Sequence, residues 1–83
     1  SYHGPFGACS GLKKITFEEG TTEISSGLFR GCTGLEEINI PNSVTEIESS
    51  SFEDCINLVS VNIPDSVIKI GNEALRGAKK LKV

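Results

Sequence analysis

Three cysteines are the residues with the clearest potential for chemistry in this chain, because thiolates form disulfides and bind zinc. Cys9, Cys32 and Cys55 follow one another at equal intervals of 23 residues, and Ala78 stands one interval further along. Residues at a fixed repeat interval point the same way from successive copies, whereas a zinc site needs ligands that converge from several directions. Free cysteine packs as a small buried hydrophobe. The spacing therefore predicts a column of buried free thiols.

The other candidate catalytic groups are serines, one histidine and pairs of glutamates. Ser43 and Ser66 have no histidine nearby, since His3 is the only histidine in the chain. The carboxylates of Glu18-Glu19 and Glu36-Glu37 are adjacent in extended segments, where neighbouring side chains point to opposite sides. A catalytic centre needs unlike groups that converge on one point. We therefore predict that the chain is not an enzyme and that it binds no cofactor or metal.

These residues lie in a chain that repeats itself about three and a half times with a period of 23 residues. The repeated columns of the central copy are Phe29, Cys32, Leu35, Ile38 and Ile47. A period in this range is typical of a solenoid, in which each repeat buries its apolar face against the next one. The sequence predicts a single domain over residues 1–83. Its repeats fall at about 6–28, 29–51 and 52–74, with a partial repeat at 75–83.

Each repeat contains two extended segments joined by a turn. The first segment covers 13–17, 36–40 or 59–63 and ends in alternating apolar and polar residues, as a strand with one buried face does. Pro41-Asn42-Ser43 and Pro64-Asp65-Ser66 favour a tight turn, and a second extended segment follows. Stacked copies of the first segment are expected to form a parallel sheet with one strand per coil.

A short helical turn is expected to close each repeat. Good N-cap residues occupy one column, namely Ser26, Ser49 and Asn72. Residues that adopt positive φ at low cost occupy the column where the helix would end, namely Gly11, Gly34 and Asn57. The helical turn would pack on the coil through its phenylalanine.

The outward positions of the predicted sheet carry the residues that could meet a partner. Lys13 and Lys14 stand opposite Glu36 and Glu37 of the next repeat, a pairing that could also serve to fix the register of the strands. The predicted partner-binding face consists of Lys13, Lys14, Thr16, Glu36, Glu37, Asn39, Val59, Ser60 and Asn62. The same set could equally be a soluble surface without a binding role.

Charge and hydropathy limit the possible partners. The net charge is −3, from 8 basic and 11 acidic residues. Nucleic acid and anionic membranes need a basic patch, so neither is expected as a partner. No stretch approaches the roughly 20 apolar residues of a transmembrane helix, and no signal peptide opens the chain. Because the chain begins with SYHGP and stops within a repeat, we interpret it as a fragment, so the missing signal peptide carries little weight.

The repeat resembles the BspA-like leucine-rich repeats. The resemblance rests on the pattern Phe29-x-x-Cys32-x-x-Leu35-x-x-Ile38-x-Ile40-Pro41-x-Ser43-Val44-Thr45-x-Ile47 and on its recurrence from Phe52 to Ile70. It implies an α/β, β-rich solenoid that forms a right-handed superhelix. The parallel sheet would lie on the concave side, with short helical turns and short extended segments elsewhere. It also implies a place in cell-surface or secreted proteins of bacteria and some protozoa.

Two functional hypotheses follow from the residues and the resemblance together. In the first, the chain is a non-catalytic interaction module of an adhesin-type surface protein, and the predicted face binds a host protein or glycan. In the second, it is a structural spacer that extends a longer array and has no ligand of its own. Binding that is abolished by substitutions on the predicted face would distinguish the first hypothesis from the second.

Overall fold

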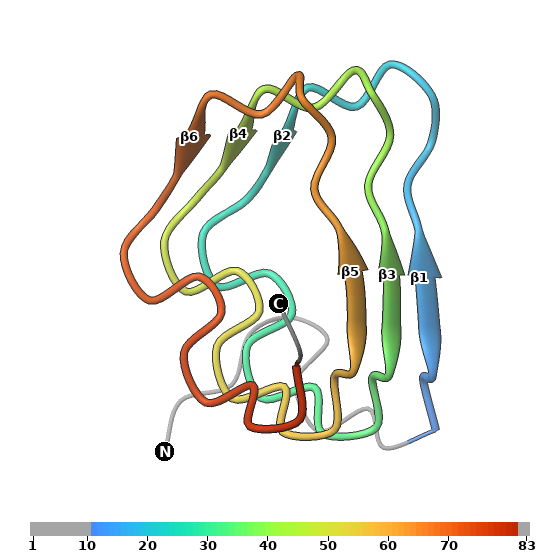
Figure 1. The fold of residues 1–83 in the computed structure, drawn as a ribbon, viewed down its shortest axis with the longest axis vertical. Helices are drawn as coiled ribbons and strands as arrows, with labels where there is room; N and C mark the ends of the chain where they lie inside the picture. Colours follow the sequence, from blue (N-terminus) through green and yellow to red (C-terminus); the bar gives the residue numbers. More distant parts are fainter. Residues whose placement is uncertain (1–10, 82–83) are drawn as a thin grey trace.

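The computed structural model describes residues 11–81, and within that range the chain forms three stacked coils (Figure 1). Each coil contributes one strand to each of two parallel sheets. The first sheet has the order β1-β3-β5, from strands Lys14–Thr16, Glu37–Asn39 and Ser60–Asn62. The second sheet has the order β2-β4-β6, from strands Glu23–Ile24, Glu46–Ile47 and Lys69–Ile70. The predicted parallel sheet is therefore confirmed, and the second extended segments form a sheet of their own.

Strand register follows the sequence period. Lys14 pairs with Glu37, which pairs with Ser60, so each partner lies 23 residues further along the chain. The second sheet keeps the same offset, since Ile24 pairs with Ile47 and Ile47 with Ile70. Side chains of a strand point alternately to its two faces, so a shift of one residue would turn the buried isoleucines outward. Burial of these isoleucines therefore fixes the register.

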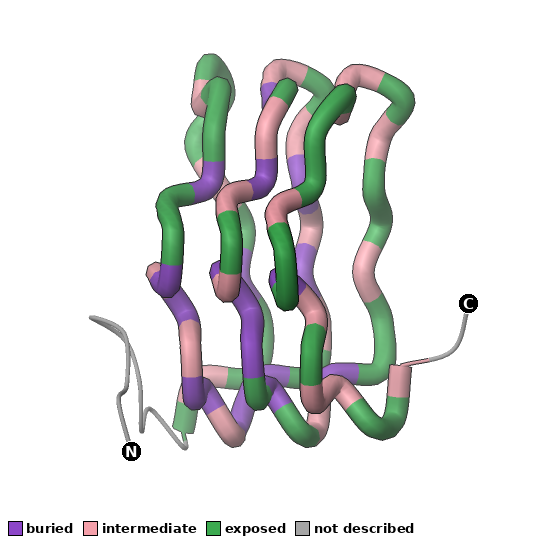
Figure 2. Tube along the Cα trace, turned by 90° about the vertical axis from the view of Figure 1, so that its left-hand side faces the viewer, coloured by how far each residue is buried: buried purple, intermediate pink, exposed green. Residues whose placement is uncertain are grey.

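The core consists of the repeated apolar columns, stacked along the axis of the solenoid. Cys32 and Cys55 are free and fully buried in it, which confirms the predicted thiol column for these two positions. Cys9 and Phe6 lie outside the described residues. Figure 2 shows buried positions in the first two coils and mostly exposed or intermediate positions in the last one. The core is therefore well covered in the middle of the stack and open at its C-terminal end.

The predicted helical turns are not present, because residues 11–81 contain no helix. In the segment expected to be helical, such as residues 27–32, every second backbone N–H donates to the carbonyl three residues earlier. The Arg30 N–H donates to the Gly27 carbonyl, and the Cys32 N–H donates to the Phe29 carbonyl. The N–H groups between them donate to the next coil, as Phe29 does to the Ser51 carbonyl at 2.8 Å. A helix would use all of these groups within itself. The chain instead forms consecutive turns that join neighbouring coils.

The columns assigned to helix capping therefore have other roles. Ser26 Oγ donates to the Ser49 carbonyl at 2.9 Å, which links two coils and caps nothing. In the segment expected to be helical, positive φ occurs in two columns that the capping argument did not select. These columns are Gly27, Ser50 and Glu73, and Gly31, Asp54 and Gly77. Each one interrupts the right-handed backbone run that a helix needs, which is the physical reason that no helix forms. The expected right-handed superhelix stays a prediction.

Candidate functional site

The predicted face lies on the outer side of the first sheet, because burial alternates along its strands. Ile15 and Ile38 are buried at the centres of β1 and β3, while the residues on either side of each are exposed or half-buried. Strand pairing places Lys14, Glu37 and Ser60 in one row and Thr16, Asn39 and Asn62 in another. Lys13, Glu36 and Val59 precede these strands. We call these nine residues the first-sheet face.

Two ion pairs cross from the first coil to the second on this face. Lys13 Nζ lies 3.8 Å from Glu36 Oε2, and Lys14 Nζ lies 3.6 Å from Glu37 Oε2. The four side chains are roughly half exposed, so each pair contributes little stability, on the order of 0.2–1 kcal/mol. The predicted pairing of opposite charges is confirmed. Its main consequence is that lysines and glutamates neutralise one another and leave a mixed, polar surface.

Asn62 has a structural role that the sequence did not reveal. Its side-chain Oδ1 accepts from the Ile40 N–H at 2.9 Å, and its Nδ2 donates to the Ile40 carbonyl at 3.1 Å. The amide therefore satisfies two backbone groups at the end of β3, just before Pro41. Both ends of the Asn62 amide are therefore engaged within the fold.

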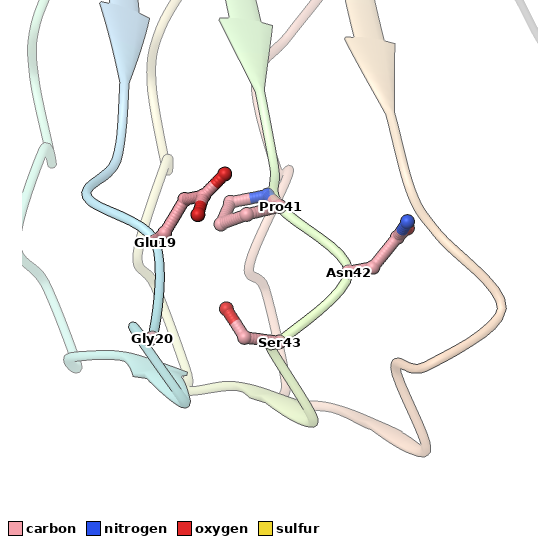
Figure 3. A pocket seen from close by; sticks show the side chains of 5 residues that line it. All are labelled: Glu19, Gly20, Pro41, Asn42 and Ser43. Carbon is pink, nitrogen blue, oxygen red and sulfur yellow. The ribbon is translucent and has the colours of Figure 1, made fainter.

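A pocket of about 270 Å³ lies at the turn edge, between the first and second coils (Figure 3). It is lined by Glu19, Gly20, Pro41, Asn42 and Ser43. The first coil turns through Glu18-Glu19-Gly20, with a φ of 92° at Gly20, where the second coil has Pro41-Asn42-Ser43. The two different turns leave space between them. Figure 3 shows the Asn42 side chain pointing away from Glu19. The pocket combines one carboxylate with a hydroxyl and contains no acid–base pair for catalysis.

The hydroxyls of Ser43 and Ser66 and the thiol of Cys55 each donate a hydrogen bond to a backbone carbonyl of the preceding coil. Ser43 Oγ donates to the Thr21 carbonyl at 2.6 Å, and Ser66 Oγ donates to the Val44 carbonyl at 2.7 Å. Cys55 Sγ donates to the Phe29 carbonyl at 3.4 Å, and burial raises the pKa of this thiol to about 12. A thiol with so high a pKa is a poor nucleophile at neutral pH, since the thiolate is the reactive form.

An acidic cluster on the second sheet was not predicted from the sequence. Glu23, Glu46 and Glu48 each place a carboxylate oxygen within 4.8 Å of the others. Glu23 and Glu46 share a column at the repeat interval, so the period could have revealed that pair. Exposed acidic groups commonly occur without a bound ion, and the cluster by itself does not identify a metal site. Within residues 11–81, no helix is long and apolar enough to span a bilayer.

Comparisons with known proteins agree with this architecture. The crystal structure of a leucine-rich cell surface protein from Faecalibacterium prausnitzii A2-165 superimposes with a TM-score of 0.87 at 33% sequence identity. The match covers 94% of this chain and 20% of that chain. None of the curated proteins that were compared matches this chain. The family model described as a BspA-type leucine-rich repeat region of six copies matches residues 2–83. The chain therefore belongs to the family of BspA-type leucine-rich repeat proteins.

Proposed function

We propose that this chain is a non-catalytic interaction module of a cell-surface or secreted protein, and that its first-sheet face binds a host protein or glycan. The observation that carries the proposal is the in-register array of outward side chains on a parallel sheet. Rows of this kind present groups about 5 Å apart from one strand to the next, on a rigid backbone. Such spacing suits an extended polypeptide or glycan laid across the coils.

The chemistry of the face supports a polar ligand of either charge. Lys14 and Glu37 present both signs within one row, and Ser60 adds a hydroxyl next to them. Val59 is half exposed and supplies an apolar contact at the edge of the row. Similarity to a protein described as a cell surface protein supports the proposed location. The described residues offer no convergent acid, base and nucleophile, which is why the proposal excludes catalysis.

The small area of the first-sheet face limits the affinity that we expect. Three strands of three residues span roughly 10 Å in each direction, which is on the order of 100–200 Å². A standard interface buries about 800 Å² on each partner. We therefore expect this chain alone to bind weakly, with micromolar or weaker affinity, and to contribute to a longer binding surface.

The experiment is a binding screen on an array of immobilised host extracellular-matrix proteins and glycans. The test variant carries Glu37→Lys and Asn39→Ala, and the matched control carries Asn42→Ala and Asp65→Ala at the turn edge. We expect the test variant to keep the circular dichroism spectrum of the wild type and to lose binding, while the control keeps both. Binding that survives in the test variant and is lost in the turn-edge control would refute the proposed face and assign function to the turns.

A spacer role is the second candidate, and the engaged side chains favour it. The Lys14–Glu37 pair and the Asn62 amide both hold neighbouring coils together. If they do nothing else, the wild-type chain will bind no component of the array. The same Glu37→Lys change will then lower stability slightly, by less than about 1 kcal/mol, and change nothing else.

A further inference from the structure

The pocket at the turn edge, which we call the turn-edge pocket, presents hydrogen-bond acceptors from both of its coils. Figure 3 shows the Glu19 carboxylate pointing from the first coil toward Pro41, and the Ser43 hydroxyl pointing from the second coil toward Gly20. The Ser43 hydroxyl donates its proton to the Thr21 carbonyl at 2.6 Å, so it faces the pocket as an acceptor only. An ionised carboxylate also only accepts, and proline has no N–H to donate. The side chains that point into this pocket therefore accept hydrogen bonds and do not donate them.

Nearby donors are used within the two turns or lie outside the pocket. The Thr21 N–H donates to the Glu18 carbonyl at 3.2 Å, and the Val44 N–H donates to the Pro41 carbonyl at 3.1 Å. The side chain of Asn42 is the remaining one among the lining residues that could donate, and it points away from Glu19 (Figure 3). A ligand held by the side chains of the turn-edge pocket must therefore supply the donors itself.

The turn edge also carries negative charge that no cation of the same edge neutralises. Its segments 17–22, 40–45 and 63–68 contain three carboxylates and no lysine or arginine. The glutamates of the first-sheet face pair with lysines, whereas the Glu19 carboxylate forms no ion pair and no hydrogen bond with residues 11–81. A surface region of one sign attracts ligands of the opposite sign. Charge and hydrogen-bonding capacity thus favour the same ligand, a cation that donates N–H bonds.

We propose that the turn-edge pocket binds the ammonium group of a lysine side chain on a partner protein, with Glu19 and Ser43 as acceptors. An ammonium group has three donors and a single positive charge on an apolar stem. Pro41 is half-buried and presents an apolar ring along which that stem packs. Arginine fits less well, because its planar donors match two oxygens of one carboxylate, and here the acceptors come from two coils. The site lies beyond the ends of β1 and β3 and does not depend on binding at the first-sheet face.

The test titrates the isotope-labelled chain with Nα-acetyl-lysine amide and follows the backbone amide shifts by NMR, which detects weak binding. The test variant is Glu19→Gln. The matched control is Glu18→Gln, which removes the same charge from the neighbouring residue, whose side chain does not line the pocket. We expect saturable shifts at Gly20 and Ser43 in the wild type and in the control. The test variant should bind the probe about tenfold more weakly or worse, because it loses a charge-assisted hydrogen bond.

Comparison ligands identify the group that is bound. Nα,Nε-diacetyl-lysine amide keeps the stem without the charge and should cause no saturable shift, and glucosamine, with its ammonium on a polar ring, should bind more weakly than the lysine probe. No saturable shift with the lysine probe, or equal binding by the Glu19→Gln and Glu18→Gln variants, would overturn the proposal. So would binding of the diacetylated probe, or of glucosamine, as tight as that of lysine. The same shifts on addition of calcium chloride would assign the pocket to a metal ion instead, although calcium prefers six to eight oxygen ligands.

Discussion

Replacement of Phe52 by alanine tests the nearest-neighbour nature of this fold. Phe52 is 1% exposed, and its ring stacks on that of Phe29 with a centroid distance of 5.6 Å and an interplanar angle of 3°. Truncation of a buried phenylalanine costs about 3–5 kcal/mol, part of it from the cavity left behind. A chain of 83 residues has a total stability of roughly 4–12 kcal/mol. The substitution therefore removes a large share of the stability and is expected to leave the chain partly unfolded at 25 °C.

The matched control is Leu75→Ala, one interval further along the same column. Leu75 is half-buried and has a coil on one side only, so its truncation should cost less, about 1–2 kcal/mol. Urea titration followed by far-ultraviolet circular dichroism measures both losses on one scale, the free energy of unfolding in water. Equal losses at Phe52 and Leu75 would refute the reasoning, because an array stabilised by its neighbours must be weaker at an uncovered end.

Three further predictions concern two glycines, the reactivity of the buried thiols and the pH dependence of stability. Gly71→Ala should destabilise the chain by about 1–3 kcal/mol or more, because the new Cβ would overlap the backbone of Ser49. Gly11→Ala should be nearly neutral, since no atom of residues 11–81 lies within 4 Å of a Cβ added there. Equal urea midpoints for the two variants would contradict this reasoning. Cys32 and Cys55 should resist alkylation at pH 8 until the chain unfolds, as mass spectrometry of the labelled peptides will show. Burial raises the pKa of Cys55 from 9.0 to about 12, so the folded state keeps a proton that the unfolded state loses, and stability should fall as pH rises from about 9 to 12.

The fold was largely predictable because one physical requirement, burial of a repeated apolar column, determines both the period and the strand register. Ile15, Ile38 and the leucine column could be placed from spacing alone. The turn segment was not predictable in the same way. Phe29 and Cys32 stand three residues apart, which suits one helical face and also suits consecutive turns. The structure shows that alternate backbone N–H groups in this segment donate to the next coil. The spacing of apolar side chains in the sequence does not indicate the direction of a backbone N–H.

The outward residues were predictable in position and less so in role. The pairing of Lys13 and Lys14 with glutamates follows directly from register, and the structure shows both ion pairs. The engagement of Asn62 with Ile40 does not follow from register, because it depends on the path of the chain into Pro41. The cluster of Glu23, Glu46 and Glu48 depends on the second sheet, which pairs Glu23 with Glu46.

Departures from the repeat at outward positions are where function can differ from one coil to the next. Inward columns and backbone bonds are shared by all coils, so substitutions there change stability before they change recognition. The third coil has exposed apolar side chains, Ile56, Val59 and Ile68, at columns where the second coil has Thr33, Glu36 and Thr45. Ile68 immediately precedes β6 and is 83% exposed, so the lack of a further coil on the stack does not account for its exposure. Val59 lies on the first-sheet face instead, which makes the third coil the more apolar end of that face. A partner that follows the strands would therefore meet charge at the first two coils and an apolar contact at the third.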